Sequence, residues 1–507
     1  MSLTAITLQN FKGIRDPIRI EMKPITLLFG PNSAGKSTIV QAIHYAREIL
    51  ERNNLNADRT LYGGEVINLG GFKNLVYRYN LNLPIMMQFD LDLSNVDLPE
   101  YSDQYLEINL SEAIETAWIK LTIKWHELSQ QAILTAYEVG INGVEIAKII
   151  TSEEGQNHSL QGKLNHPLIL SFFSYDIEKY VEEHNQIIDG WVKVAALNFA
   201  ALPKWGKSFE IIETELSSIF GEEGQIYSEY LLSQVTIGPG ERLRDMLRQF
   251  RYLGPIRKIP PRNFDPTLSP DEASWANGMA AWNTLYRKDQ TFLEEVSQWM
   301  AEDNRINTGY HLRINQFVEL DISLKDGILL SGCDQIDNYT YSELQKLPIH
   351  RRLVLVEKNN GLEVLPQDVG VGISQLLPVV VAALDTNSTE MFEYIVAIEQ
   401  PELHIHPAIQ VALGDIFISQ INKTDMIFLL ETHSENLLLR LLRRIRETND
   451  NELPTEELKL QPEQISVIYV EQQNDGVKLS PLRVDETGEF IDIWPQGFFE
   501  ERAEELF

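Results

Sequence analysis

Residues 30–38 read Gly30-Pro31-Asn32-Ser33-Ala34-Gly35-Lys36-Ser37-Thr38. They follow the apolar run of residues 25–29 and fit the pattern G-x-x-x-x-G-K-[ST] of a phosphate-binding loop completely. The residues after the loop place apolar side chains at helical spacing, namely Ile39, Ile43, Ala46, Ile49 and Leu50. The sequence therefore predicts a strand, a loop and a helix in this order.

The chemistry of such a loop follows from its residue types. Glycines let the backbone fold tightly, so that successive N–H groups and the positive end of the following helix converge on a polyphosphate. Lys36 would reach the β- and γ-phosphates, and Ser37 would hold Mg²⁺. A plain Gly/Ser turn is the alternative, but it does not explain the Lys-Ser-Thr end. We therefore expect a nucleoside triphosphate site at residues 30–38.

Composition narrows the class of protein. The chain has 507 residues, of which 43% are hydrophobic and 23% charged, as in a globular protein with several structural units. The single cysteine, Cys333, excludes an internal disulfide and a Cys-rich zinc site, and it suits a reducing compartment. The apolar run of residues 376–384 is far shorter than the roughly 20 residues that a membrane helix needs. We expect a cytoplasmic protein that does not enter a membrane.

The formal net charge of −31 argues against a surface that coats nucleic acid broadly, because phosphate contacts need Lys and Arg. A local basic groove stays open as an alternative. Residues 242–262 concentrate the cations Arg242, Arg244, Arg248, Arg251, Arg257, Lys258 and Arg262. This segment is either a solvated helix face with a connector or a contact for phosphate or nucleic acid.

Strand patterns fill the first part of the chain. Residues 3–8, 18–22 and 25–29 read as strands, and the turn at residues 10–15 places Lys12 and Arg15 near the loop. These two cations would face the nucleotide or lie on a solvated turn. Alternating segments predict an antiparallel sheet over residues 80–150, and helical spacing predicts an inserted helical region after it. That helical spacing involves Ile177, Tyr180, Val181, Phe209, Ile211, Ile212, Leu216 and Ile219.

The second half supplies candidate partners for the loop. An apolar strand at residues 394–399 ends in Glu399-Gln400-Pro401-Glu402, and carboxylates placed so can hold Mg²⁺ and a hydrolytic water beside a phosphate loop. A second apolar strand, residues 426–430, ends in Glu431-Thr432-His433-Ser434. Open parallel sheets place ligand-binding groups at the carboxyl ends of such strands. Gly370, Gly372 and Ser374 open an apolar helix and form a weaker candidate anion site.

Taken in order, these elements resemble the nucleotide-binding head of the ABC ATPase superfamily. The similarity is to the stand-alone heads grouped with RecF, the structural-maintenance-of-chromosomes (SMC) proteins and the overcoming-lysogenization-defect nucleases. It covers residues 1–50 and 350–445. The tail at residues 492–500 is similar to a short uncharacterised domain that often closes such heads. The motifs that correspond are the signature at residues 370–375, Walker B at 395–402, the D-loop at 403–407 and the switch histidine at 431–434.

The resemblance implies an α/β, two-lobed head with a mixed P-loop sheet flanked by helices, an antiparallel β subdomain and a helical insertion. It also implies that two chains sandwich two ATP molecules with Mg²⁺, so that the protein forms a homodimer or a higher homo-oligomer. Gly372, Ser374 and Gln375 would then contact the γ-phosphate bound by Lys36 of the other chain. We predict an N-terminal ATPase lobe at 1–165, a helical insertion at 166–265, a C-terminal ATPase lobe at 266–450 and a tail domain at 451–507.

In this resemblance Glu399 is the Mg²⁺-supporting acid and His433 is the switch residue. Gln400, however, stands where most ABC heads carry the catalytic glutamate, and an amide cannot accept the proton of a water as a carboxylate does. Either Glu402 is the base, which we favour from the sequence, or hydrolysis is slow and the ATP-bound dimer is long-lived. His406 stands where many heads have a D-loop aspartate.

The resulting functional hypothesis is an ATPase whose ATP-driven dimer regulates a separate effector, such as a nuclease, in anti-phage defence. The alternative is a DNA-maintenance ATPase that binds duplex ends through residues 242–262. A transporter ATPase subunit fits less well, because such subunits place Walker A much closer to the signature.

Overall fold

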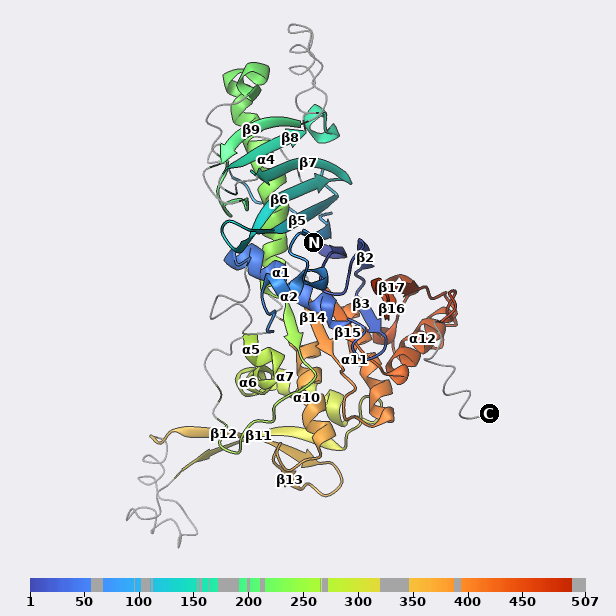
Figure 1. The fold of residues 1–507 in the computed structure, drawn as a ribbon. Coiled ribbons are helices and arrows are strands. Elements are labelled where there is room, and N and C mark those ends of the chain that lie inside the picture. Colours follow the sequence, from blue (N-terminus) through green and yellow to red (C-terminus); the bar gives the residue numbers. More distant parts are fainter. Residues whose placement is uncertain are drawn as a thin grey trace.

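The structure is a computed structural model in which three sheets follow one another along the molecule (Figure 1). The eight-stranded sheet lies at the top of the view, the central sheet in the middle and a three-stranded sheet at the bottom. The structure describes residues 1–55, 67–94, 96–101, 110, 113–152, 155, 157–163, 165–171, 191–197, 201–209, 215–264, 266, 272–319, 346–386 and 394–494.

The central sheet has the strand order β10-β14-β15-β3-β16-β17. Its first five strands run parallel, and β17 returns antiparallel to β16. Every residue of β3 and β15 is buried, the pattern of parallel strands covered on both faces. The strands are β10 (Arg251–Leu253), β14 (Tyr394–Glu399), β15 (Met426–Glu431), β3 (Ile25–Phe29), β16 (Ile465–Gln473) and β17 (Gly476–Leu482).

Alternate side chains of the central sheet enter two different hydrophobic cores. On β15, Ile427 and Leu429 pack into the core shared with the eight-stranded sheet. Phe428 and Leu430 pack into the core on the opposite face. The sheet is thus fixed from both sides, and its carboxyl edge presents the ends of β3, β14 and β15 together.

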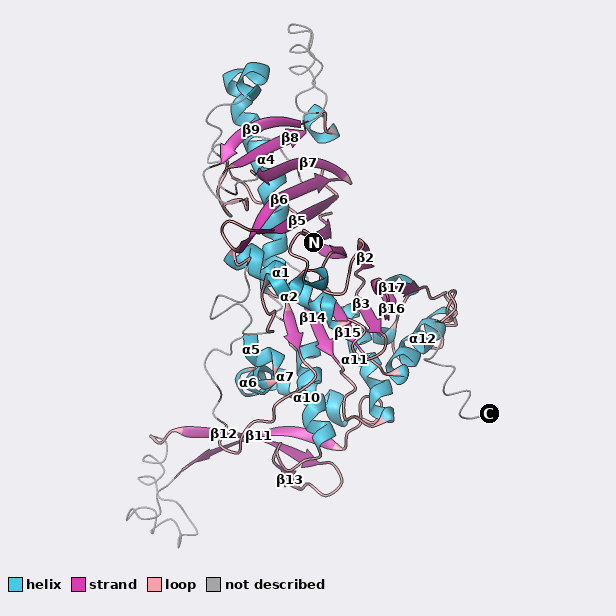
Figure 2. Cartoon of the chain, viewed as in Figure 1, coloured by secondary structure: helices cyan, strands magenta, loops and turns pink. Residues whose placement is uncertain are grey.

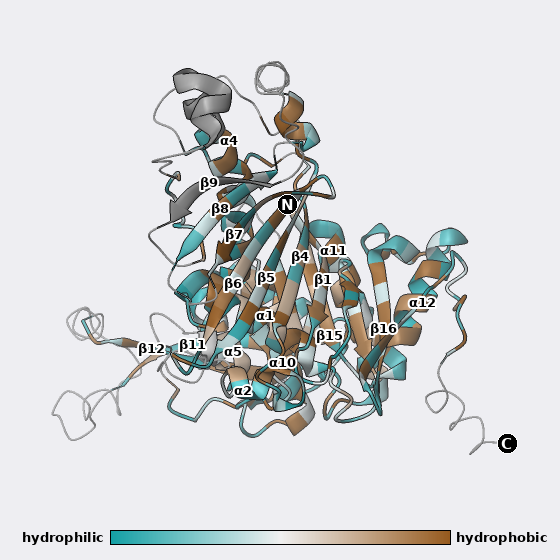
Figure 3. Ribbon diagram, turned by 45° about the horizontal axis from the view of Figure 1, so that its top comes forward, coloured by the Kyte–Doolittle hydropathy of each residue, from teal (hydrophilic) through white to brown (hydrophobic). Residues whose placement is uncertain are grey.

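The antiparallel sheet has the order β2-β1-β4-β5-β6-β7-β8-β9. The burial of β4 alternates strictly, and hydrophobic positions run along β6 and its neighbours (Figure 3). The antiparallel sheet predicted for residues 80–150 is confirmed. Its strands are β1 (Ser2–Gln9), β2 (Ile18–Glu21), β4 (Ile85–Asp92), β5 (Thr116–His126), β6 (Gln131–Ile141), β7 (Val144–Thr151), β8 (His158–Lys163) and β9 (Trp191–Leu197).

The region predicted to be helical contains strands as well. β9 pairs with β8, and β10 joins the central sheet, while α4 spans Glu215–Arg248. Each of these strands is held by a partner distant in sequence, which helical spacing in a local window does not reveal. Leu216 and Ile219 lie in α4. Other positions on which the sequence analysis relied lie outside the described residues, namely Ile177, Tyr180, Val181, Ile211, Ile212 and Cys333.

Helices cover both faces of the central sheet (Figure 2). The third sheet has the order β11-β12-β13, with bounds Tyr310–Val318, Ile349–Glu357 and Glu363–Val364. The remaining helices are α1 (Ser37–Arg52), α2 (Phe72–Leu75), α5 (Glu272–Ala276), α6 (Met279–Arg287), α7 (Gln290–Ala301), α10 (Val371–Leu384), α11 (Pro407–Lys423) and α12 (Glu435–Asn449), with 3-10 turns η1 (Tyr77–Tyr79), η2 (Glu456–Leu458) and η3 (Pro462–Gln464).

Two strands of the predicted tail domain, β16 and β17, belong to the central sheet. β16 pairs with β3 from Ile465 opposite Ile25 to Tyr469 opposite Phe29. Trp494 packs its ring against Phe29, the last residue before the phosphate loop. The mixed α/β class predicted from the sequence is confirmed. In the part of the chain that the structure describes, none of the helices combines the length and the apolarity needed to cross a bilayer.

Candidate nucleotide site

The phosphate loop is shaped by two glycines, Gly30 and Gly35, at which any other residue would strain the backbone. Gly30 has φ 144° and Gly35 has φ 99°, a region that side chains with a Cβ rarely adopt. A Cβ on Gly30 would overlap the carbonyl oxygen of Val470 in β16, and one on Gly35 would lie 2.9 Å from a methyl group of Val477. The β16–β17 hairpin therefore packs directly against the loop at both glycines. Pro31, Asn32 and Ser33 are exposed at its tip, and Ala34 is buried.

Lys36 is almost completely buried within the loop that it belongs to. Its Nζ donates hydrogen bonds of 2.9 Å to the carbonyl oxygens of Gly30 and Pro31. Burial lowers the pKa of Lys36, while the charges of Glu431, Glu402 and Glu399 oppose that change. The ammonium group thus lies between loop carbonyls and carboxylates, where a bound phosphate would be within its reach.

Two carboxylates end neighbouring strands beside the loop. Glu399 of β14 lies directly opposite Glu431 of β15 in the strand register. The hydroxyl of Ser37 donates to Glu431 Oε2 at 2.7 Å, and that of Tyr252 donates to Glu399 Oε1 at 3.0 Å. Burial and the charge of Glu431 raise the pKa of Glu399 to about 7. Burial also raises the pKa of Glu431, which Ser37 and Lys36 oppose. Two close carboxylates favour a bound cation.

Glu402, the candidate base, is tied to the switch loop. Its Oε1 accepts a hydrogen bond of 2.7 Å from the backbone N–H of His433, and its Oε2 accepts one of 2.8 Å from the hydroxyl of Thr432. Burial raises the pKa of Glu402, and these hydrogen bonds oppose the rise. Both oxygens therefore already serve to join the Walker B turn to the end of β15.

Gln400 adopts φ 46°, in the left-handed region. Its N–H donates to the carbonyl of Glu431 at 2.7 Å, which continues the β14–β15 pairing by one step. The turn is held further by Arg257, whose guanidinium donates to the carbonyls of Glu399 and Gln400 at 2.7 and 3.1 Å.

His433 presents a polar atom without a partner. Its Nε2 is buried and makes no hydrogen bond with any residue that the structure describes. Burial lowers the pKa of His433, and the charge of Lys36 adds to that effect. A neutral imidazole carries one donor and one acceptor nitrogen, so this site can accommodate a hydrogen-bonding ligand. The neighbouring Ser434, by contrast, caps α12 by accepting from the N–H of Leu437.

The predicted signature opens α10, whose first residue is Val371. Gly370 and Val371 are exposed, whereas Ser374 is buried and donates its hydroxyl hydrogen bond to the carbonyl of Pro366 at 2.8 Å. Ser374 therefore does not present its hydroxyl at the surface in this conformation. Gly372 lies against the D-loop turn, since a Cβ there would meet the carbonyl oxygen of His404 at 2.6 Å. His406 caps α11 with its ring nitrogen.

Arg257 is a site residue that sequence reasoning assigned only to a basic segment. Its side chain is buried, and its backbone exchanges hydrogen bonds with the Gln375 amide at 3.2 and 2.7 Å. With the carbonyl contacts at Glu399 and Gln400, Arg257 connects the signature helix to the Walker B turn. Arg257 lies 118 residues before Gln375 in the sequence, so no local pattern indicated this role.

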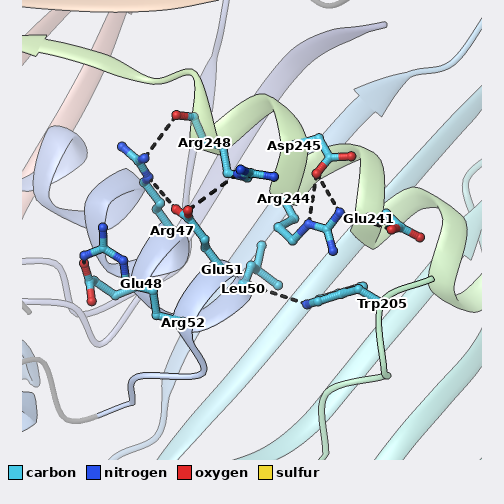
Figure 4. Close-up of polar contacts among 10 residues, drawn as sticks. All are labelled: Arg47, Glu48, Leu50, Glu51, Arg52, Trp205, Glu241, Arg244, Asp245 and Arg248. Atoms are coloured by element: carbon cyan, nitrogen blue, oxygen red, sulfur yellow. Dashed lines mark hydrogen bonds and ion pairs between the residues drawn. The ribbon is translucent and has the colours of Figure 1, made fainter. Parts of the chain in front are cut away.

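The other arginines of residues 242–262 also have acceptors on the chain. Figure 4 shows Arg244 on α4 bonded to Asp245, and Arg248 close to Glu51 of α1. Glu51 also accepts from Arg47, which donates to the carbonyl of Arg248 at 3.0 Å. The helix of the phosphate loop is thus joined to α4. Arg242 bonds to the Asp97 carbonyl, Arg251 pairs with Asp385 and Arg262 pairs with Asp368, while Lys258 is exposed.

The turn that carries Lys12 and Arg15 lies next to the loop, with Val477 between the two. A Cβ on Gly13 would meet a methyl group of Val477 at 2.5 Å, and the same side chain faces Gly35. Burial lowers the pKa of Lys12, and Arg15 is exposed. The structure therefore places the turn beside the loop but separates it from the loop by an apolar side chain.

The residues present fit a Mg²⁺-nucleoside triphosphate. Loop N–H groups and Lys36 suit phosphates, and oxygen ligands from Ser37, Glu399 and Glu431 suit a hard divalent cation. The partnerless Nε2 of His433 lies near Lys36 and suits a phosphate oxygen.

Three family models match the chain. Residues 1–190 match an AAA ATPase domain. Residues 242–440 match "AAA domain, putative AbiEii toxin, Type IV TA system". Residues 460–507 match a protein of unknown function (DUF3696). The two ATPase matches contain the phosphate loop, the Walker B strand and the switch histidine, so both parts of the site lie in regions that match AAA ATPase domains, which supports ATPase activity.

Solved structures of SMC heads are similar at low identity. The SMC head bound to the C-winged helix domain of ScpA is 10% identical, covers 96% of this chain and 98% of its own, and has a TM-score of 0.40. The Pyrococcus furiosus SMC head bound to the C-terminal domain of ScpA is 9% identical, with 99% and 98% covered and a TM-score of 0.39. The Thermotoga maritima SMC head is 8% identical, with 96% and 100% covered and a TM-score of 0.38. None of the curated proteins is significantly similar in sequence.

Proposed function

We propose that this ATPase closes around ATP as a homodimer and that the ATP-bound dimer regulates a separate effector protein in anti-phage defence. The observation that carries the proposal is the exposed start of α10, where Gly370 and Val371 lie at the surface. The phosphate loop and the carboxylates of the same chain lie on other elements. An exposed helix N-terminus suits a phosphate bound by a second copy of the chain.

The proposed roles follow the geometry. Residues 30–38 bind the triphosphate, Ser37 and Glu399 hold Mg²⁺, and His433 contacts the γ-phosphate through Nε2. Mg²⁺ would neutralise charge on the phosphates during hydrolysis. Gly372, Ser374 and Gln375 act on the ATP of the partner, which requires the hydroxyl of Ser374 to leave Pro366 and the amide of Gln375 to leave the backbone of Arg257 when the dimer forms.

Slow turnover is part of the proposal. Gln400 lacks a carboxylate, and both oxygens of Glu402 accept hydrogen bonds from the switch loop. This arrangement favours a long-lived ATP-bound state over rapid hydrolysis by Glu402, the base that the sequence favoured. A long-lived state suits a regulator that must hold an effector in one condition until a signal arrives.

The defence role rests on the description of the model that matches residues 242–440, which names a type IV toxin–antitoxin system. Direct DNA binding gains no support from the arginines of residues 242–262, because each has an acceptor on the chain. We therefore propose a cytoplasmic ATPase that works through a protein effector.

Light scattering with a non-hydrolysable ATP analogue tests the dimer. We expect the wild type to double its mass with the analogue, and Val371→Arg to stay monomeric while it still binds nucleotide, because Val371 is 56% exposed at the start of α10. Leu128→Arg, at an exposed turn between β5 and β6, is the matched control and should dimerise normally. Dimerisation of Val371→Arg would show that this face is not the interface.

A plaque assay tests the biological role. Cells that carry the native gene cluster should lose protection against phage when Lys36 is replaced by Ala. Unchanged protection would refute an ATP-dependent role in defence.

A further inference from the structure

Glu431 begins the motif at residues 431–434, in which the sequence analysis assigned a role only to His433. Glu431 is the last residue of β15, which lies between β14 and β3 in the central sheet. β3 leads into the phosphate loop and β14 ends at Glu399, so the strand order brings Glu431 between the two functional ends.

The contacts of Glu431 are with the loop itself. Its Oε2 accepts the hydrogen bond from Ser37, and its Oε1 lies 4.0 Å from Nζ of Lys36. Lys36 directs its own hydrogen bonds to the carbonyls of Gly30 and Pro31. The carboxylate of Glu431 therefore lies beside the two side chains that a phosphate loop uses for the metal and the phosphates.

Glu431 is also bonded to the position where an acid is missing. The N–H of Gln400 donates to the carbonyl of Glu431, so the two residues are direct neighbours across β14 and β15. A carboxylate absent from position 400 is present one strand away. The pair of acids at the loop is thus formed by Glu399 and Glu431, from two strands instead of two consecutive residues.

The negative charges of Glu399 and Glu431 favour a bound cation between them. Glu431 is buried and Glu399 is partly buried, and two ionised carboxylates in such a position repel each other unless one keeps a proton or a positive charge lies between them. Lys36 supplies one charge, but bound phosphates would draw its ammonium group to themselves. Mg²⁺ takes oxygen ligands and is usually held by one or two carboxylates together with substrate phosphates.

We propose that Glu431 is the second carboxylate of the Mg²⁺-ATP site, supplied by β15 beside Glu399 of β14. The inference rests on the proposed ATP site but not on dimerisation or on an effector. A metal-supporting role and a purely structural role of Glu431 can be distinguished by experiment. If Glu431 supports the metal, its loss changes nucleotide affinity with Mg²⁺ more than without Mg²⁺.

Titration calorimetry with a non-hydrolysable ATP analogue, in Mg²⁺ and in EDTA, tests the inference on the full chain. Glu431→Gln keeps an acceptor for Ser37 but removes the charge. We expect the Mg²⁺-dependent gain in affinity to fall about tenfold or more in this variant. Affinity in EDTA should stay equal or become tighter, because a carboxylate that repels the phosphates has been removed. Glu452→Gln, the same change at an exposed position, should behave as wild type.

A second variant tests whether the charge at this position matters. Glu431→Asp keeps the carboxylate and should retain most of the Mg²⁺-dependent gain. If Glu431→Gln folds and keeps the wild-type gain, the inference is overturned while the ATP site stands. If the wild type binds the analogue in neither buffer, the ATP site itself is refuted. Should Glu431→Gln fail to fold, Glu431→Asp keeps the charge and must retain part of the gain for the inference to hold.

Discussion

The carboxylate of Glu402 accepts a hydrogen bond of 2.7 Å from the backbone N–H of His433, two residues beyond the end of β15. With the Thr432 hydroxyl on its other oxygen, Glu402 joins the Walker B turn to the switch loop. A change at the γ-phosphate that moves His433 would therefore also move the turn that carries Glu399 and Gln400. The contact is a mechanical link between the two loops at the site.

This link leads to a prediction for Glu402. Glu402→Gln keeps an oxygen acceptor, so we expect steady-state ATP turnover within about threefold of wild type, whereas loss of a general base costs roughly a hundredfold or more. Glu402→Ala removes both contacts and should lower turnover about tenfold. Phosphate release measured for both variants distinguishes a general base from a residue that links the Walker B turn to the switch loop. A hundredfold loss in Glu402→Gln would restore Glu402 as the base.

Introducing an acid at position 400 should accelerate hydrolysis. Gln400→Glu places a carboxylate where most ABC heads have one, and we expect kcat to rise about tenfold or more. The dimer formed with hydrolysable ATP should have a lifetime that shortens in proportion to the rise in kcat. Single-turnover and steady-state phosphate release measure both effects. A variant with unchanged kcat would show that the missing acid does not limit turnover.

Lys36→Ala should abolish tight nucleotide binding. The ammonium group is the buried cation of the loop, and hydrogen bonds to charged groups contribute about 1.5–3 kcal/mol, which corresponds to roughly ten- to hundredfold in affinity. Lys258→Ala, at an exposed position of the basic segment, is the control and should bind ATP as wild type. Calorimetry in Mg²⁺ measures the ATP affinity of both variants. Equal affinities would show that Lys36 does not contribute to nucleotide binding.

Arg257 is expected to stabilise the fold as well as the site. Its replacement by Ala leaves the carbonyls of Glu399 and Gln400 without their buried donor, which should lower the free energy of unfolding by about 2 kcal/mol. Arg262→Ala, whose side chain is 61% exposed, should cost about 0.5 kcal/mol or less. Urea denaturation measures both values. Equal values for the two variants would contradict the connecting role of Arg257.

The raised pKa of Glu399 predicts a pH dependence of the ligand-free protein. Between the usual pKa of 4.5 and about 7, the folded chain keeps a proton on Glu399 that the unfolded chain has lost. Unfolding then releases a proton, so this group makes stability fall as pH rises through that interval. Glu399→Gln should remove this contribution. Urea denaturation at several pH values across the interval tests it, and identical pH profiles for the two proteins would contradict it.

Much of the fold could be predicted from local patterns. The alternation of β4 and its neighbours predicted the antiparallel sheet, and the apolar runs of β3, β14 and β15 predicted buried parallel strands. β9 was missed because it depends on pairing with β8, which no local pattern shows. The insertion of β16 beside β3 was missed for the same reason, since pairing between distant segments has no local pattern.

By itself, the sequence determined the phosphate loop, because nine consecutive residues contain both its backbone freedom and its charged groups. It also predicted that Glu399, Gln400 and His433 lie around the loop, from their places at the ends of apolar strands. Only the tertiary structure decided the contact between Ser37 and Glu431, which are 394 residues apart in sequence. That contact depends on the strand order β14-β15-β3, and the order is set by two hydrophobic cores closing over both faces of the sheet rather than by any residue near Glu431.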